Sequence, residues 1–183
     1  MMNSNNLILI ILSLIVLACG GQVQWHATPS AEPIAVNEQA AQQLKQNAYQ
    51  ALAEASVTYE ATFYVTDEQI TSLVALELTR TGQIPIQQPQ IWFKSNQIHV
   101  TGIVSVAGVD VTMYLTGSAF VQDSQLLFEI KTAQIDYIDM PDTTLLSLTQ
   151  TINEALAELS LDVEITQVEI LEGEMRVKGK RDE

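Results

Sequence analysis

The chain has 183 residues, a formal net charge of −14 and a single cysteine. Its 22 acidic residues outnumber its 8 basic residues, which argues against nucleic-acid binding, because phosphate backbones are bound through lysine and arginine. A lone cysteine excludes an intrachain disulfide, so the fold must depend on hydrophobic burial.

An almost wholly apolar stretch, residues 7–17, leads directly to Ala18 and Cys19. The run Val-Leu-Ala-Cys-Gly-Gly at its end resembles the signal of bacterial lipoproteins, in which a small residue precedes a cysteine that receives a diacylglyceryl group. As a helix rising 1.5 Å per residue, the stretch is too short to cross about 30 Å of hydrocarbon. We therefore expect residues 1–18 to be a signal peptide and Cys19 to be the lipidated first residue of the mature protein.

This interpretation places the protein on the extracytoplasmic side of the cell membrane or the outer membrane. Two acyl chains suffice for stable anchoring, whereas the acidic surface disfavours adsorption on anionic lipid. Residues 19–36, which contain Pro29, Ser30 and Pro33, are expected to form a tether. No low-complexity run or repeat divides residues 37–183, so they are expected to form a single domain with one core.

Residues 37–55 show helical periodicity, with Asn37 in the position of an N-cap. The apolar residues that recur on one face are mostly alanine: Ala40, Ala41, Leu44, Ala48, Ala51, Leu52 and Ala55. Such a face predicts a helix that packs closely or is only loosely held. Ser56 is expected to end the helix, and residues 57–65, rich in β-branched and aromatic side chains, are expected to form a strand.

A second helix is predicted from a capping box, in which Thr66 and Gln69 stand three residues apart. Ile70, Leu73, Val74 and Leu78 then form one apolar stripe. Gly82 is expected to end this helix. Pro85 and Pro89 are expected to keep the following segment extended.

The apolar period changes to two from residue 90 onwards. Apolar and polar residues alternate over residues 98–106 and 109–116, on either side of an Ala-Gly turn, and again after a turn at residues 122–124. This pattern predicts an antiparallel meander with one apolar and one largely polar face. The alternation slips near Ala133, where a β-bulge would bend the sheet.

Pro141 and Asp142 open a third predicted helix, in which apolar residues recur at mostly helical spacing. Residues 163–171 and 175–180, joined by a Glu-Gly turn, are predicted to close the chain as a hairpin. The fold class is therefore α+β: a curved antiparallel meander sheet with two or three helices on one face.

Residues that commonly carry catalysis are sparse. His26 lies in the tether, and His99 lies on a predicted strand, where a surface or hydrogen-bonded role is favoured over that of a catalytic base. Asp136, Asp139 and Asp142 lack the glycine and terminal glutamate of a calcium loop, so helix capping and solvation explain them better. We expect no metal, no cofactor and no enzymatic activity; a hydrolase that uses these carboxylates is the remote alternative.

The apolar interior is the remaining candidate for function. The aliphatic, methionine and aromatic side chains of the meander face the stripes of the second and third helices. They either make a dry core or line a groove for acyl chains, and alternation alone does not separate these possibilities. The candidate groove residues are Ile70, Leu73, Val74, Val100, Val104, Met113, Leu115, Phe128, Ile130, Leu148 and Ile152.

Three short segments add a resemblance that spans residues 57–180. They are Phe-Tyr-Val-Thr-Asp-Glu-Gln-Ile at 63–70, Ile-His-Val-Thr-Gly at 98–102 and Ile-Asn-Glu-Ala-Leu at 152–156. With the signal and the order of elements, they resemble bacterial lipoproteins and envelope proteins of the TULIP-like (BPI-like) fold, in which a bent sheet wraps a long helix. The resemblance implies binding of phospholipid or other acyl-chain ligands, and it transfers no individual functional residue.

Two hypotheses for function follow. The first is a lipid-anchored, non-enzymatic envelope protein that binds a phospholipid or other apolar ligand between curved sheet and helices. The second is a structural or adaptor lipoprotein with a filled core, which acts on a protein partner of unknown identity through its acidic surface or strand edges.

Overall fold

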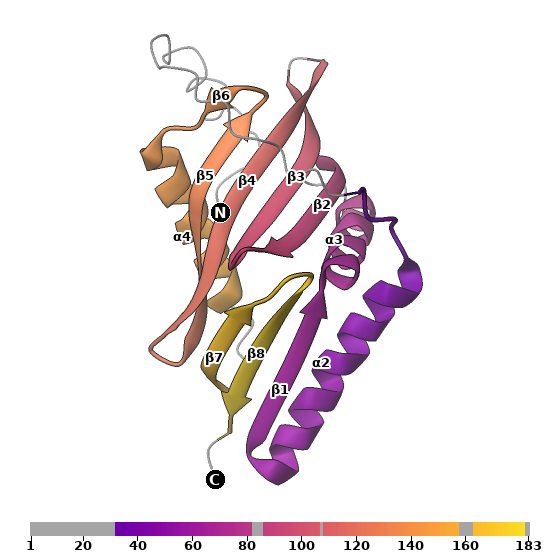
Figure 1. Ribbon diagram of the computed structural model, residues 1–183, viewed down its shortest axis with the longest axis vertical. Helices are drawn as coiled ribbons and strands as arrows, with labels where there is room; N and C mark the ends of the chain where they lie inside the picture. The colour runs from indigo at the N-terminus through magenta and orange to yellow at the C-terminus, as the bar shows by residue number, and fades with distance from the viewer. Residues whose placement is uncertain (1–31, 82–85, 107, 158–162, 182–183) are drawn as a thin grey trace.

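Three helices and eight strands form an α+β fold within residues 32–81, 86–106, 108–157 and 163–181, which the computed structural model describes (Figure 1). The strands make two antiparallel sheets, of three and five strands. The fold class is therefore as predicted. The signal peptide, Cys19, the tether up to residue 31, and the punctuating residues Gly82, Pro85 and Ala107 lie outside the described residues.

Helix α2 (Glu38–Thr58) begins as predicted. The Asn37 side chain accepts hydrogen bonds from the N–H groups of Gln39 and Ala40, at 2.9 and 3.4 Å. The helix ends at Thr58 rather than at residue 55, because Tyr59 adopts the left-handed conformation (φ 61°) and donates its N–H to the Ala55 carbonyl. The alanine face packs closely, since Ala40, Ala41, Ala51 and Ala55 are all buried.

The smaller sheet pairs the first strand of the described chain with the last two. Its strands are β1 (Glu60–Thr66), β8 (Glu174–Lys180) and β7 (Glu164–Ile170), in that order. The predicted closing hairpin is confirmed as β7–β8. The pairing of β1 with β8 separates these strands from the meander, so two sheets replace the single sheet expected.

The larger sheet is the predicted meander. It consists of β2 (Ile86–Lys94), β3 (Gln97–Val106), β4 (Val109–Gln122), β5 (Gln125–Ile135) and β6 (Ile138–Asp139), in sequence order. A bulge on β5 is confirmed, at Lys131 rather than near Ala133: Thr116 pairs with Thr132, whereas Gly117 pairs with Ile130. A Cβ atom at Gly117 would lie 2.7 Å from the Glu129 carbonyl oxygen, so the bulge depends on this glycine.

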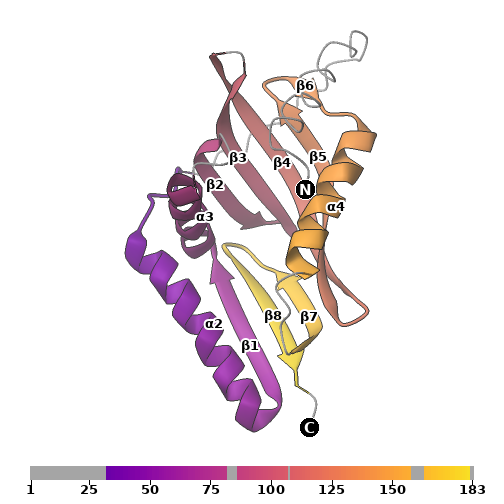
Figure 2. The ribbon, with the colours of Figure 1, turned by 180° about the vertical axis from the view of Figure 1, so that it is seen from behind.

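Helices α3 (Asp67–Thr81) and α4 (Asp142–Ala157) lie at opposite edges of the larger sheet. Figure 2 shows α3 beside β2 and α4 beside β5, with β3 and β4 between them. The predicted capping box of α3 is confirmed, because Gln69 N–H donates to Thr66 Oγ1 at 3.3 Å and Thr66 N–H donates to Gln69 Oε1 at 3.1 Å.

Candidate functional site

One face of the larger sheet is apolar across four strands. Cross-strand register aligns Ile91 with Val100 and Val100 with Leu115, and further along the strands it aligns Val104 with Val111. The bulge at Lys131 restores the alternation on β5, so Ile135 lies opposite Met113 on the same face. This apolar face is the surface on which the predicted groove residues of the meander lie.

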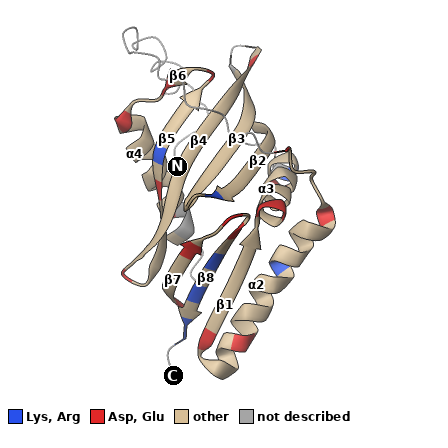
Figure 3. Cartoon of the chain, viewed as in Figure 1, with Lys and Arg blue, Asp and Glu red and all other residues tan. Residues whose placement is uncertain are grey.

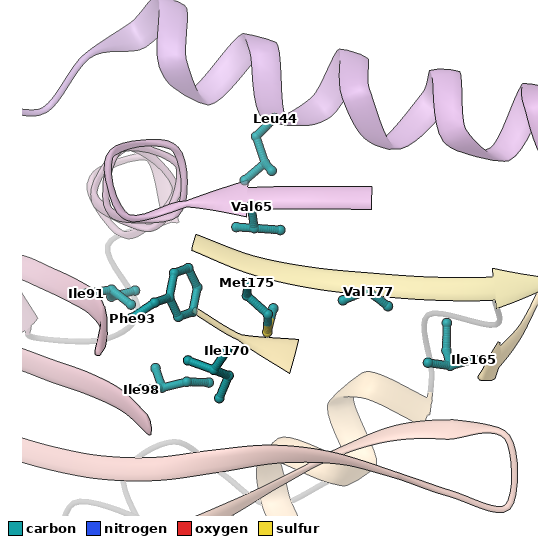
Figure 4. Close-up of a cluster of buried hydrophobic side chains, with 9 residues drawn as sticks. All are labelled: Leu44, Val65, Ile91, Phe93, Ile98, Ile165, Ile170, Met175 and Val177. Atoms are coloured by element: carbon teal, nitrogen blue, oxygen red, sulfur yellow. The ribbon is translucent and has the colours of Figure 1, made fainter. Parts of the chain in front are cut away.

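The part of the apolar face nearest the smaller sheet is covered. The side chains of the two sheets meet in a core that also includes Leu44 of α2 (Figure 4). Its buried members are Leu44, Val65, Ile91, Phe93, Ile98, Ile165, Ile170, Met175 and Val177. This region therefore forms a packed core between the sheets.

Helix α4 covers a second part of the same face. Leu145 of the helix packs with Ile130 and Ala133 of β5 in a buried cluster, and Leu115 and Leu148 pack against it. The predicted amphipathic stripe of the third helix thus contacts the sheet through its first two turns.

Side chains of α3 close the outer edge of β2. Thr71 is fully buried, and its hydroxyl both accepts from the N–H of Ile91 at 2.9 Å and donates to the C=O of Ile91 at 3.1 Å. Asp67 Oδ1 accepts from the N–H of Phe93 at 2.7 Å, and the C=O of Phe93 accepts from the N–H of Gly173 at 2.9 Å. These backbone groups would otherwise be available for pairing with another strand.

Side chains of α4 close the outer edge of β5 in the same way. Asn153 accepts from the N–H of Phe128 at 2.8 Å and donates to its C=O at 2.9 Å. Thr149 Oγ1 accepts from the N–H of Ile130 at 3.1 Å. Both helices are thereby held at the edges of the sheet rather than across its middle.

Between the helices lies an apolar strip that belongs to neither buried cluster. It consists of Val104 on β3, Val111 and Met113 on β4, and Ile135 on β5, and all four are only half-buried. Apolar side chains in the middle of a sheet are usually buried by the layer packed on them. We call this set the central strip.

The structure divides the predicted groove residues among three environments. Those packed against the core between the sheets are Ile70, Leu73, Val74, Val100 and Phe128. Those in or against the α4 cluster are Ile130, Leu115 and Leu148. Val104 and Met113 lie in the central strip.

Ile152 is not brought together with the others. It is 37% exposed and belongs to neither cluster. The neighbouring Asn153 turns towards the edge of β5, so this turn of α4 meets the edge of the sheet rather than its apolar face.

The sequence interpretation missed two kinds of site residue. Val111 and Ile135 complete the central strip, and alternation alone left Ile135 out of phase because its phase is set by the bulge. Thr71 and Asn153 close the sheet edges. Their only signal is a polar residue within or beside an apolar helical stripe, and this signal does not identify the partner strand.

The carboxylates near α4 have structural partners. Asp136 Oδ1 accepts from the N–H of Thr112 at 3.0 Å, and Asp139 Oδ1 accepts from the side-chain amide of Gln134 at 2.6 Å. Among the described residues, no group of three or more His, Cys, Asp or Glu side chains is placed to hold a metal ion. His99 is half-buried on the polar face, between Trp92 and Thr116 on the adjacent strands.

A carboxylate lies where the two sheets meet. Burial raises the pKa of Asp67 above its ordinary value, and the charge of nearby Glu172 raises it further, although the hydrogen bond from Phe93 N–H acts in the opposite direction. The turn that carries Glu172 also bonds to α3 and β2, since the Gly173 carbonyl accepts from the N–H of Asp67 at 3.0 Å. We therefore expect the junction between the sheets to be sensitive to pH.

Acidic and basic residues lie along β7 and β8 of the smaller sheet (Figure 3). Arg176 on β8 pairs with Glu169 on β7, and Lys180 pairs with Glu164 at 3.0 Å. Hydrogen bonds to Glu169 and Tyr64 raise the pKa of the Arg176 guanidinium. Two of the basic side chains near the C-terminus are thus neutralised across the strands.

None of the helices α2, α3 and α4 is long and apolar enough to cross a membrane. Comparison with known proteins found no matching family model, no matching curated protein and no matching solved structure. The resemblance to the TULIP-like fold therefore stays a prediction.

Proposed function

We propose that this chain is a lipid-anchored, non-enzymatic protein of the cell envelope that holds a phospholipid or another acyl-chain ligand on the central strip. The TULIP-like resemblance of the sequence and the lipoprotein-like signal at Cys19 support the assignment. The anchor would keep the strip close to the bilayer that supplies the ligand.

The observation that carries this proposal is that the helices of the described chain lie beside the central strip, whose side chains are only half-buried. Val104, Val111, Met113 and Ile135 lie in the middle of a five-stranded sheet, yet none of them is buried. The hydrogen bonds of Thr71 and Asn153 hold α3 and α4 to the two outer strands, so neither helix lies across the strip. A hydrocarbon chain laid along the strip would remove these side chains from water, a gain of roughly 25 cal/mol per Å² of apolar surface.

The test is the lipid content of the full chain purified from a bacterial membrane. Native mass spectrometry and organic extraction are expected to find an acyl-chain ligand in the wild-type protein. Met113→Gln should lower the amount of bound ligand several-fold without unfolding the protein, because the side chain is only half-buried. Thr112→Gln, on the opposite face of the same strand, is the matched control and should leave the ligand in place. Repeated absence of ligand from the wild-type protein would contradict the proposal.

Lipidation is tested separately. Mass spectrometry of the mature N-terminal peptide should show a diacylglyceryl group on Cys19, and Cys19→Ser should leave the protein without it. An unmodified Cys19 in a membrane that processes lipoproteins would contradict the anchor.

The adaptor hypothesis is the second candidate. It is favoured by the packed core between the sheets, which contacts five of the predicted groove residues. An adaptor is expected to stay free of ligand and to unfold at the same temperature before and after organic extraction. A carrier should lose stability on extraction, since a ligand that binds only the folded state stabilises it.

A further inference from the structure

Large apolar side chains are exposed at both ends of the molecule, on the C-terminal half of α2 (Tyr49, Leu52 and Val57) and, at the other end, on elements that continue the central strip. Val109, the first residue of β4, is 62% exposed, Tyr137 and Ile138 are 71% and 58% exposed around the β5–β6 turn, and Leu146 is 69% exposed on the first turns of α4. The start of β4, β6 and the start of α4 lie at the same end of the long axis in both views (Figures 1 and 2). We call these four residues the apolar tip.

The tip continues the central strip rather than standing apart from it. Ile138 pairs with Ile135, and Val109 begins the strand that carries Val111 and Met113. Hydrogen bonds between Asp136 and the backbone of Thr112, at 2.7 and 3.0 Å, fix the β5–β6 turn against β4. Apolar surface therefore extends from the half-buried middle of the sheet to its exposed end.

We propose that the apolar tip dips into the surface of a lipid bilayer, so that the central strip opens onto the lipid phase. This inference rests on the proposed function, because it supplies the route by which an acyl chain would reach the strip. Aliphatic side chains beside a tyrosine suit the boundary between hydrocarbon and headgroups, where an aromatic ring with a polar end is favoured.

The tether is long enough for this contact. The described chain begins at Glu32, and Ile34 is held to β2 by two hydrogen bonds with the Gln90 side chain, at 2.6 and 3.1 Å. Fifteen residue steps separate Cys19 from Ile34, which reach at most about 50 Å when extended. Gln90, which holds Ile34, pairs with Thr101 on β3. From Thr101, strand β3 runs towards the tip and rises about 3.3 Å per residue. The tip therefore lies well within reach of a bilayer that holds the anchor.

The charges around the tip specify the kind of surface. Asp110, Asp139 and Asp142 are all exposed beside it, and carboxylates are repelled by anionic headgroups over a Debye length of about 8 Å at physiological salt. The tip therefore fits a surface of zwitterionic lipid, such as phosphatidylcholine or phosphatidylethanolamine, better than one rich in anionic lipid.

The experiment exploits the single cysteine of the chain, whose thiol is blocked if it is lipidated. Val109→Cys and Ile138→Cys are each introduced into the full chain, labelled with the fluorophore NBD and reconstituted in phosphatidylcholine vesicles that contain brominated lipid. Both labels should shift to the blue and be quenched several-fold more than a label at Val57→Cys, the matched control. Val57 is 78% exposed near the C-terminal end of α2, at the opposite end of the molecule. Labelled wild-type protein measures any contribution from Cys19 itself.

Replacing half of the phosphatidylcholine with phosphatidylglycerol should reduce the quenching at both tip positions. Equal signals at residues 57, 109 and 138 in phosphatidylcholine would overturn the proposal. The substitutions are at exposed positions, and an unchanged unfolding transition confirms the fold of each variant. Lipid content is measured on the same samples. If the protein carries ligand but its tip labels are not quenched, the proposed insertion of the tip is contradicted alone. If the tip labels are quenched but the protein carries no ligand, the proposed carrier function is contradicted alone.

Discussion

The side-chain amide of Asn153 in α4 pairs with the backbone of Phe128 in β5 as a neighbouring strand would, through one accepted and one donated hydrogen bond of 2.8 and 2.9 Å. A helix thus completes the hydrogen bonding of an outer strand without adding a strand. The position of α4, and with it one boundary of the central strip, depends on this contact.

Asn153→Ala should lower the free energy of unfolding by about 1–3 kcal/mol, because it leaves partly buried backbone groups of β5 without partners. Asn153→Asp should be at least as damaging, since it places a second acceptor against the Phe128 carbonyl. Urea denaturation measures both effects. Gln150→Ala is the control: this exposed side chain donates to Glu154 on the same helix, so a change within about 0.5 kcal/mol is expected. An unchanged free energy of unfolding for Asn153→Asp would show that the side-chain amide does not hold the helix in place.

Thr71 provides the corresponding test at β2. Thr71→Val keeps the shape of the side chain but removes both hydrogen bonds to Ile91, so we expect a loss of about 1–3 kcal/mol for each backbone group left unpaired. Thr71→Ser keeps the hydroxyl and deletes one buried methyl group, for a loss of about 1 kcal/mol. The midpoint of urea unfolding should therefore fall further for valine than for serine. The reverse order would mean that packing, not hydrogen bonding, makes Thr71 important.

Asp67 should make stability depend on pH with an unusual sign. Because its pKa is raised on folding from the ordinary value of 3.8, its stabilising contribution is fully present below pH 3.8 and is lost as the pH rises through the higher folded pKa. Asp67→Asn stays neutral and keeps an acceptor for Phe93 N–H, so its stability relative to wild type should increase from about pH 4 to about pH 7. Thermal unfolding across this range measures the difference.

A second variant separates the two causes of the shift. Glu172→Gln removes the neighbouring charge, lowers the pKa of Asp67 and should weaken the pH dependence without abolishing it, since burial remains the larger cause. Parallel pH profiles for wild type and Asp67→Asn would contradict the raised pKa.

Gly117→Ala tests the bulge that bends β5. The new Cβ atom would meet the Glu129 carbonyl oxygen at 2.7 Å, so strand β4 or β5 must shift. We expect a loss of about 1–3 kcal/mol in unfolding free energy, typical of overpacking. Ser118→Ala, at the next position of the same strand, should change stability by less than about 1 kcal/mol. An alanine at residue 117 without effect would show that the sheet bends easily at this point.

Local features of the fold were predictable from the sequence. The cap at Asn37, the capping box of Thr66 and Gln69 and the turns at residues 122–124 and 172–173 are each determined by neighbouring residues, and all are present. The division into two sheets was not predictable, because it depends on the pairing of Glu60 with Lys180 from opposite ends of the domain. Alternation identifies strands, but it does not identify partners so far apart in the chain.

The candidate site was predictable only in part, for a related reason. Alternation placed Val104 and Met113 on the apolar face, but Phe128 and Val100 show the same alternation and pack against the core. What distinguishes them is which other element covers each position, and that is a tertiary property. The bulge also moved Ile135 to the apolar face, a change that depends on Gly117 of the neighbouring strand.

Because helix side chains cap both edges of the larger sheet, they affect how the protein behaves at high local concentration. On β2, the outward backbone groups of Ile91 and Phe93 already bond to Thr71, Asp67 and Gly173. On β5, the outward backbone groups of Phe128 and Ile130 already bond to Asn153 and Thr149. These groups are therefore not available for strand pairing with neighbouring molecules on a crowded surface. The same contacts that hold α3 and α4 beside the outer strands thus protect the edges of the sheet from intermolecular aggregation.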